Sequence, residues 1–151
     1  MTVSALQLAG EIIRRSGARG RLLTNLSVQK LAYFCHGWHL ALTGHPLVGG
    51  EQFAAWKFGP VLPSVYHKLK VFSSNPIPPE HPIVQGEAVA LDQTSSQIVD
   101  KVLELYDRYT GPQLVTMSHT SGGPWDKAWK ANADEIQDES IEKYFKSLIK
   151  H

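Results

Sequence analysis

Apolar residues recur at helical spacing along much of the chain, and the longest such stretch runs from Asn25 to Thr43. Thr24 or Asn25 can cap its first turn, and Gly44 follows its last residue, as is common at helix ends. At about 100° per residue, one stripe collects the apolar side chains. This stripe contains Val28, Leu31, Ala32, Cys35, Trp38, His39 and Leu42. The pattern predicts a helix at the centre of the core.

The same spacing predicts shorter helices on both sides of this one. A first helix is expected over residues 3–15, and another begins at Pro63, a residue that suits the first helical position. Further helices are expected over residues 95–109, 112–119, 124–129 and 139–149.

Between the helices, residues 53–58 alternate in a way that is typical of a short strand. We expect it to pair with residues 46–48 and to end at Gly59–Pro60, because proline cannot donate to a neighbouring strand. Residues 73–82 are rich in proline and predict a loop, and residues 83–91 could add a short strand. The expected fold is mainly α (α+β): one compact helical domain over residues 1–151, with about six helices and a small β-hairpin or short sheet in the middle.

Composition narrows the classes of partner. The chain has 15 basic and 14 acidic residues and a formal net charge of +1, which argues against a nucleic-acid or membrane partner. Its one cysteine excludes an intramolecular disulfide and suits a reducing cytosol. We see neither a secretory signal nor a run of apolar residues long enough to cross a membrane. A cytoplasmic protein is therefore expected.

Cys35, His36 and His39 are the residues most suggestive of a metal or thiol site. Cys35 and His39 fall inside the apolar stripe, where burial makes a thiol inert, and no second cysteine or histidine pair supplies further ligands. The sequence also lacks a G-x-S-x-G elbow and a phosphate-binding glycine loop. We expect no enzyme, metal or cofactor, and a metal- or thiol-dependent enzyme centred on these three residues stays the alternative.

A second alternative is a DNA-binding autoregulator. Residues 95–119 could form a helix, a Gly111–Pro112 turn and a second helix. The second helix has no Lys or Arg, although phosphate contacts dominate affinity for DNA. Two core helices joined by a bend is the favoured interpretation.

The remaining candidate is an aromatic surface around residues 54–69. Trp56 and Tyr66 belong to the residue types that are enriched at binding hot spots, and Lys57 and His67 lie beside them in the sequence. Tryptophan is more often a core residue than an interface residue, so a structural role is the favoured interpretation for any single one.

Several motifs together give the chain a family resemblance. They are LTNLSVQKLAYF at residues 23–34, GWH at 37–39, GHPL at 44–47 and AWKFGPVLPSVY at 55–66, followed by residues 103–109, 114–119 and Pro124–Trp125. In order and spacing they resemble the Panacea antitoxin domain family, which includes SocA-like antitoxins and phage-associated GepA-like proteins. Phe58, Thr110 and Cys35 depart from the usual pattern of tyrosine, glycine and a small or polar residue at these positions.

The resemblance implies a largely helical antitoxin with a small sheet, encoded beside its toxin in a prophage or defence locus. Such a protein would neutralise a cognate protein toxin by direct contact, or as an adaptor that delivers the toxin to a protease. On this basis we predict a toxin-binding surface formed by the aromatic surface around residues 54–69, extended by one residue from the motif at 114–119 and one from Pro124–Trp125. The predicted residues are Trp56, Lys57, Tyr66, His67, His119 and Trp125.

Overall fold

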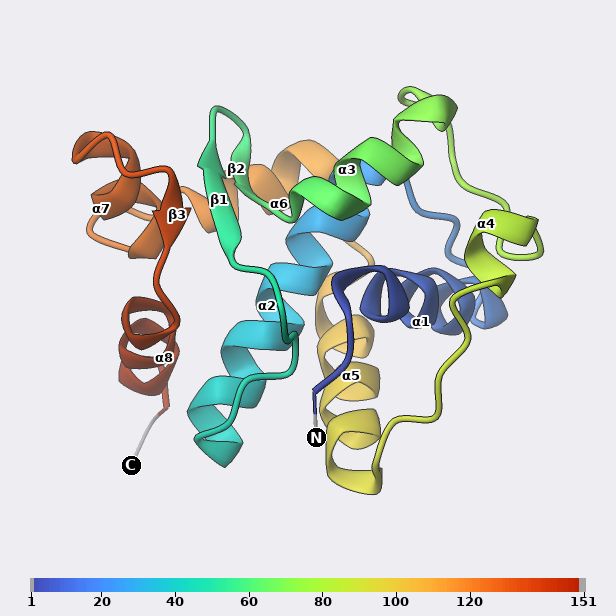
Figure 1. Ribbon diagram of the computed structural model, residues 1–151, viewed down its shortest axis with the longest axis horizontal. Helices are drawn as coiled ribbons and strands as arrows, with labels where there is room; N and C mark the ends of the chain where they lie inside the picture. The colour runs from blue at the N-terminus through green and yellow to red at the C-terminus, as the bar shows by residue number, and fades with distance from the viewer. Residues whose placement is uncertain (1, 150–151) are drawn as a thin grey trace.

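The computed structural model describes residues 2–149 and is built mainly of helices around one central helix, α2 (Figure 1). Within these residues the helices are α1 (Ala5–Ala18), α2 (Asn25–Thr43), α3 (Pro63–Leu69), the 3-10 turn η1 (Lys70–Phe72), α4 (Pro82–Gln85), α5 (Gln93–Tyr106), α6 (Gly111–Ser118), α7 (Pro124–Lys130) and α8 (Asp138–Ser147). The strands are β1 (Phe53–Trp56), β2 (Gly59–Val61) and β3 (Glu135–Ile136). The expected mainly α fold with a small sheet is confirmed.

Helix α2 begins and ends where its sequence predicts. The Thr24 side chain accepts a hydrogen bond from the Ser27 amide, and Gly44 ends the helix in the left-handed conformation at φ 75°. Its neighbours surround it, with α1 and α5 on one side and α8 on the other (Figure 1). The helix is therefore buried around most of its circumference, not along one stripe. Leu42, which the stripe placed inward, is 59% exposed near the end of the helix.

The sheet differs from the predicted pairing. Strand β1 lies in the middle and pairs antiparallel with β2 and β3, with Trp56 opposite Gly59. The predicted partner, residues 46–48, is wrong, because Val48 instead forms an isolated parallel bridge with Val3. Gly59–Pro60 does not end the strand region but opens β2. Strand β2 lies at the edge of the sheet, where a proline is tolerated because its missing N–H has no strand to meet.

Helix boundaries account for the other differences. Residues 82–85 form the short helix α4, whose first turn is capped by the His81 side chain, and no strand forms over residues 83–91. Helix α5 ends at Tyr106, so Tyr109, the last residue of the helix predicted over 95–109, lies in the turn before α6. Thr110, one of the departures from the family pattern, is the N-cap of α6 and forms a capping box with Gln113.

Aromatic side chains fill the core between α2, β1 and α8. The ring of Tyr33 lies 5.6 Å from that of Phe53 and 5.5 Å from that of Phe145, both edge-on. Pairs of this geometry stabilise a fold by about 0.5–1.5 kcal/mol beyond their buried area. Gly37 allows the close approach of α8, since a Cβ at this position would lie 2.2 Å from the Phe145 ring. This core fixes the C-terminal half of α2, while the N-terminal half contacts the hairpin.

Candidate functional site

Two buried polar side chains near the start of α2 hold the β1–β2 hairpin. Gln29 accepts a hydrogen bond from the Leu62 amide at 2.8 Å and donates to the Asn25 side chain at 3.2 Å. The Lys30 ammonium donates to the Pro60 carbonyl at 2.9 Å. Buried polar groups need such partners, because an unsatisfied one costs about 1–3 kcal/mol. The pair therefore fixes the backbone of residues 60–62.

Lys30 is unusual because its side chain is 0% exposed and no carboxylate pairs with it among the described residues. Burial disfavours the charged form and lowers the pKa of Lys30 to about 7. The Lys30 side chain packs directly against Gly59. A Cβ at position 59 would lie 2.9 Å from the Lys30 Cε atom and 2.7 Å from Ser118 Oγ, so a larger residue does not fit there. Gly59 also has φ 105°, which only glycine adopts readily.

A third support comes from α7. The Trp125 indole N–H donates to the Trp56 carbonyl at 2.7 Å, and the Trp125 side chain is only 7% exposed. The His119 ring stacks on the Trp125 ring, with the two centroids 3.7 Å apart. The Trp129 ring also stacks on Trp125, with the two centroids 5.4 Å apart. Burial, followed by the charge of Lys30, lowers the pKa of His119. His119 and Trp125 thus lie behind the hairpin and support it.

The outer side of the hairpin and α3 presents large side chains to solvent. We call residues 56–67 the corner. Phe58 is 60% exposed and Tyr66 is 39% exposed, and Lys57 is also exposed. The Tyr66 ring lies edge-on to Trp56, with centroids 5.1 Å apart, and edge-on to His67, with centroids 5.5 Å apart. These aromatic side chains are partly ordered by one another before any partner binds.

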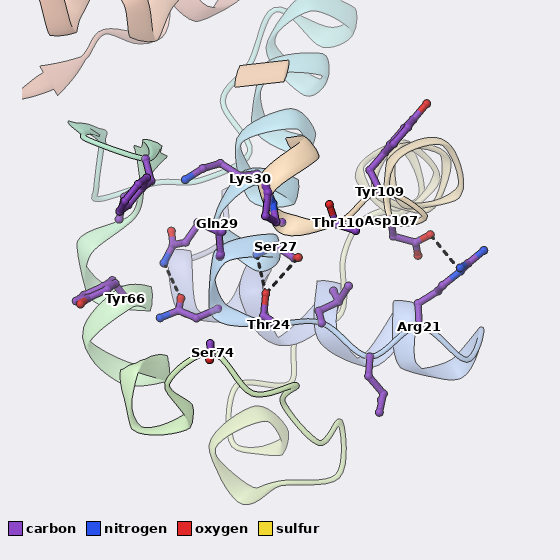
Figure 2. A pocket seen from close by; sticks show the side chains of 18 of the residues that line it. Arg21, Thr24, Ser27, Gln29, Lys30, Tyr66, Ser74, Asp107, Tyr109 and Thr110 are labelled. Carbon is purple, nitrogen blue, oxygen red and sulfur yellow. Dashed lines mark hydrogen bonds and ion pairs between the residues drawn. The ribbon is translucent and has the colours of Figure 1, made fainter. Parts of the chain in front are cut away.

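The corner forms one wall of an open cleft of about 960 Å³ (Figure 2). The opposite wall comes from the loop between α1 and α2 and from the turn between α5 and α6, so segments distant in sequence meet here. The start of α2 lies between the two walls, with Thr24, Ser27, Gln29 and Lys30 visible in Figure 2. Leu22, 60% exposed, lines the second wall.

A buried carboxylate holds the second wall together. Asp107 accepts a hydrogen bond from the Ser16 hydroxyl at 2.9 Å and pairs with the Arg19 guanidinium at 2.9 Å. Arg21 approaches the same carboxylate at 4.0 Å (Figure 2). The next residue, Arg108, lies over the Tyr109 ring at 5.2 Å from its centroid. The ion pairs of Asp107 tie the α1–α2 loop to the α5–α6 turn and define that side of the cleft.

The cleft combines apolar walls with a positive rim. Its exposed basic lining residues are Arg21, Lys57 and Arg108, while Lys30 is buried beneath the cleft, and its one acidic lining residue is Asp107. The Asp107 carboxylate is already paired with arginines, so it offers little negative charge to a partner. The excess of positive charge is local, since the whole chain has a net charge of only +1.

The residues considered for a metal or thiol enzyme are each used for internal contacts. Cys35 is fully buried, and burial raises the pKa of its thiol. His36 accepts from the Val48 amide at 3.2 Å, so its other ring nitrogen donates to Asp138, 2.8 Å away. His39 donates to the His45 carbonyl at 2.7 Å. Within residues 2–149, no three His, Cys, Asp or Glu side chains come together in a metal-binding arrangement.

The structure brings together half of the predicted site. Trp56, Lys57 and Tyr66 line the cleft, and His67 is exposed beside Tyr66. His119 and Trp125 stand on the inner side, as described above. Sequence reasoning missed the second wall. Two signals could have found it: the basic Arg19–Gly20–Arg21 segment between two predicted helices, and the Arg108–Tyr109 pair at the end of a third. No helix within the described residues has the length and hydropathy needed to span a membrane.

Comparison with known proteins agrees with the motifs. Residues 28–126 match the family described as antitoxin SocA-like, Panacea domain. The chain is similar to the antitoxin SocA of Caulobacter vibrioides (strain NA1000 / CB15N), with 38% identity over 137 residues that cover 83% of this chain and 70% of that protein. No solved structure gives a significant match. The residues matched by the family, 28–126, include Gln29 and Lys30 of α2, the corner and the α5–α6 turn.

Proposed function

The chain belongs to the SocA-like antitoxins with a Panacea domain, and from this premise we propose that it neutralises a cognate protein toxin by direct binding through the corner. A protein toxin is the partner that an antitoxin requires. Trp56, Lys57, Tyr66 and His67 are the residues assigned to the contact. Neutralisation by contact needs no catalytic group, cofactor or metal in this chain.

The observation that supports this assignment is the contrast between the backbone of the corner and its side chains. The backbone is fixed from within by Gln29, Lys30 and Trp125. The side chains of Phe58 and Tyr66 nevertheless remain exposed. Aromatic groups on a preorganised backbone lose little entropy on binding, so they make efficient anchors for a partner.

Co-expression with the product of the neighbouring gene tests the proposal. That product should stop growth when expressed alone, and this chain should restore growth. Tyr66→Ala should weaken the rescue, because it removes an exposed anchor without opening the core. Leu42→Ala is the matched control: it also truncates an exposed side chain, but at the far end of α2 and outside the cleft.

Three results would count against the proposal. The neighbouring product could be harmless, or equally toxic with and without this chain, which removes the antitoxin role. Rescue that requires the host protease, with toxin levels that fall only when the protease is present, indicates delivery to a protease and overturns direct neutralisation. Equal rescue by Tyr66→Ala and wild type removes the corner as the contact surface.

A further inference from the structure

We infer that the cleft binds an acidic segment of the toxin, whose apolar side chains enter between the two walls while its carboxylates meet the basic rim. This rests on the proposed function and extends it from the corner to a two-walled site. The occupant is defined by its chemistry: a protein segment in which aspartate or glutamate flanks one or more large apolar residues.

The first argument is charge complementarity. Lys57 extends from the corner and Arg21 and Arg108 from the opposite wall, so basic groups lie on both sides of the opening. Neither Lys57 nor Arg108 forms an ion pair with a carboxylate of the described chain. A segment that supplies carboxylates would satisfy these groups, and a basic segment would be repelled.

The second argument concerns the start of α2 and of α6. Both N-terminal turns line the cleft, through Thr24–Ser27 and through Thr110–Pro112. The positive ends of these two helix dipoles therefore add to the field of the basic side chains. All of these fixed charges favour the same sign of ligand.

The third argument is the placement of apolar residues. Leu22 and Phe58 stand at the opening on opposite walls, each 60% exposed, with Tyr66 beside Phe58. Pockets for small molecules enclose most of the ligand surface, whereas large apolar groups at an open rim remain wet unless a broad partner covers them. A protein segment that continues beyond the cleft covers them.

Affinity measurements with the purified toxin that this chain neutralises test the assignment. The variant Lys57→Glu/Arg108→Glu reverses one charge on each wall. It should slow association about ten- to hundredfold, because rim charges act mainly on the rate of encounter. The wild-type association rate should fall as salt rises, and the variant should lose this dependence. Lys127→Glu/Lys143→Glu, two exposed lysines outside the cleft, is the matched control and should associate at the wild-type rate.

A charge exchange identifies the partner residues. Lysine substitutions at acidic positions of the toxin should restore association with Lys57→Glu/Arg108→Glu and weaken it with wild type. Leu22→Asp, on the opposite wall from Phe58, should raise the dissociation rate because it removes an apolar contact. Circular dichroism and thermal unfolding of each variant separate loss of binding from loss of folding.

The assignment is overturned if wild type binds and neutralises the toxin while both cleft variants do so equally well. That result leaves the antitoxin role intact and places the contact elsewhere. It is also overturned if the cleft variants lose binding to a single-stranded RNA oligonucleotide while their affinity for the toxin is unchanged. Failure of wild type itself to bind or neutralise the toxin instead removes the proposed function.

Discussion

The two ends of helix α2 both bury polar side chains, but they use them differently. At the C-terminal end, Cys35, His36 and His39 are enclosed, and the histidines bond to Asp138, Val48 and His45. At the N-terminal end, Gln29 and Lys30 hold residues 60–62, whose outer surface forms a wall of the cleft. We call these the closed end and the supporting end.

This difference shows that reactive residue types are a poor guide to function in this chain. The closed end has the cysteine and histidines that suggest chemistry, yet each has an internal partner or no access to solvent. The supporting end has a lysine and a glutamine that suggest nothing in sequence, and they position exposed aromatic groups beside a cleft. Substitutions at the closed end should therefore change stability alone, whereas those at the supporting end should also change toxin binding.

The largest effect is expected from Gly37→Ala at the closed end. Its Cβ would lie 2.2 Å from the Phe145 ring, so α2 and α8 must move apart. We expect a loss of about 3 kcal/mol in the free energy of unfolding, at the upper end for overpacked cores. Urea denaturation measures it. Gly86→Ala, in an ordinary helical conformation at φ −66°, is the control. A Gly37→Ala protein as stable as wild type contradicts the described packing of α8.

The next effect concerns Lys30 and depends on pH. Its pKa is about 7 in the folded protein and 10.5 when solvated, so the unfolded chain binds more protons between these values. The free energy of unfolding should therefore rise with pH, by about 1.4 kcal/mol per unit at most and about 1.6 kcal/mol from pH 7 to 8.5, because the folded lysine is already half deprotonated at pH 7. Lys30→Met should lack this rise.

The difference between wild type and Lys30→Met isolates the lysine. Burial of Cys35 contributes the opposite slope above pH 8.5, where the unfolded thiol ionises, but it does so in both proteins. Parallel stability curves for the two proteins from pH 7 to 8.5 would show that Lys30 is solvated. Toxin binding by Lys30→Met should also weaken, because the Pro60 carbonyl loses its donor and the corner can shift.

The smallest effect is expected from Cys35→Ala. It removes one buried sulfur atom and leaves every hydrogen bond described above in place, so the free energy of unfolding should fall by about 1 kcal/mol. Growth rescue in the co-expression assay should equal that of wild type. A folded Cys35→Ala protein that fails to neutralise the toxin would restore the thiol alternative and reverse the comparison between the two ends.

The sequence was sufficient for features that depend on local spacing. Thr24, Pro63 and Gly44 mark helix ends through their own backbone preferences, so α2 and the start of α3 were predictable. It was insufficient where the outcome depends on distant partners. Pro60 was interpreted as the end of a strand because sequence does not show that β2 lies at an edge or that its carbonyl meets Lys30.

The candidate site also divides into a part set by local sequence and a part set by distant contacts. The corner was predicted because its residues are adjacent in sequence. The second wall was missed because Leu22 and Arg108 are brought together by Asp107, whose contacts with Ser16 and Arg19 span most of the chain. Trp125 was assigned to the surface because its residue type fits both an interface and a core, and only the bond to the Trp56 carbonyl shows which side of the corner it occupies.

Hydrogen–deuterium exchange of this chain, alone and with its bound toxin, tests the central claim most directly. The claim is that the cleft between the corner and the α5–α6 turn is the toxin-binding surface. Toxin should slow exchange in peptides covering residues 20–27, 56–66 and 107–112, and leave residues 40–50, near the closed end, unchanged. Protection confined to α7, α8 or residues 40–50, with the three cleft segments exchanging as in the free protein, would contradict the account.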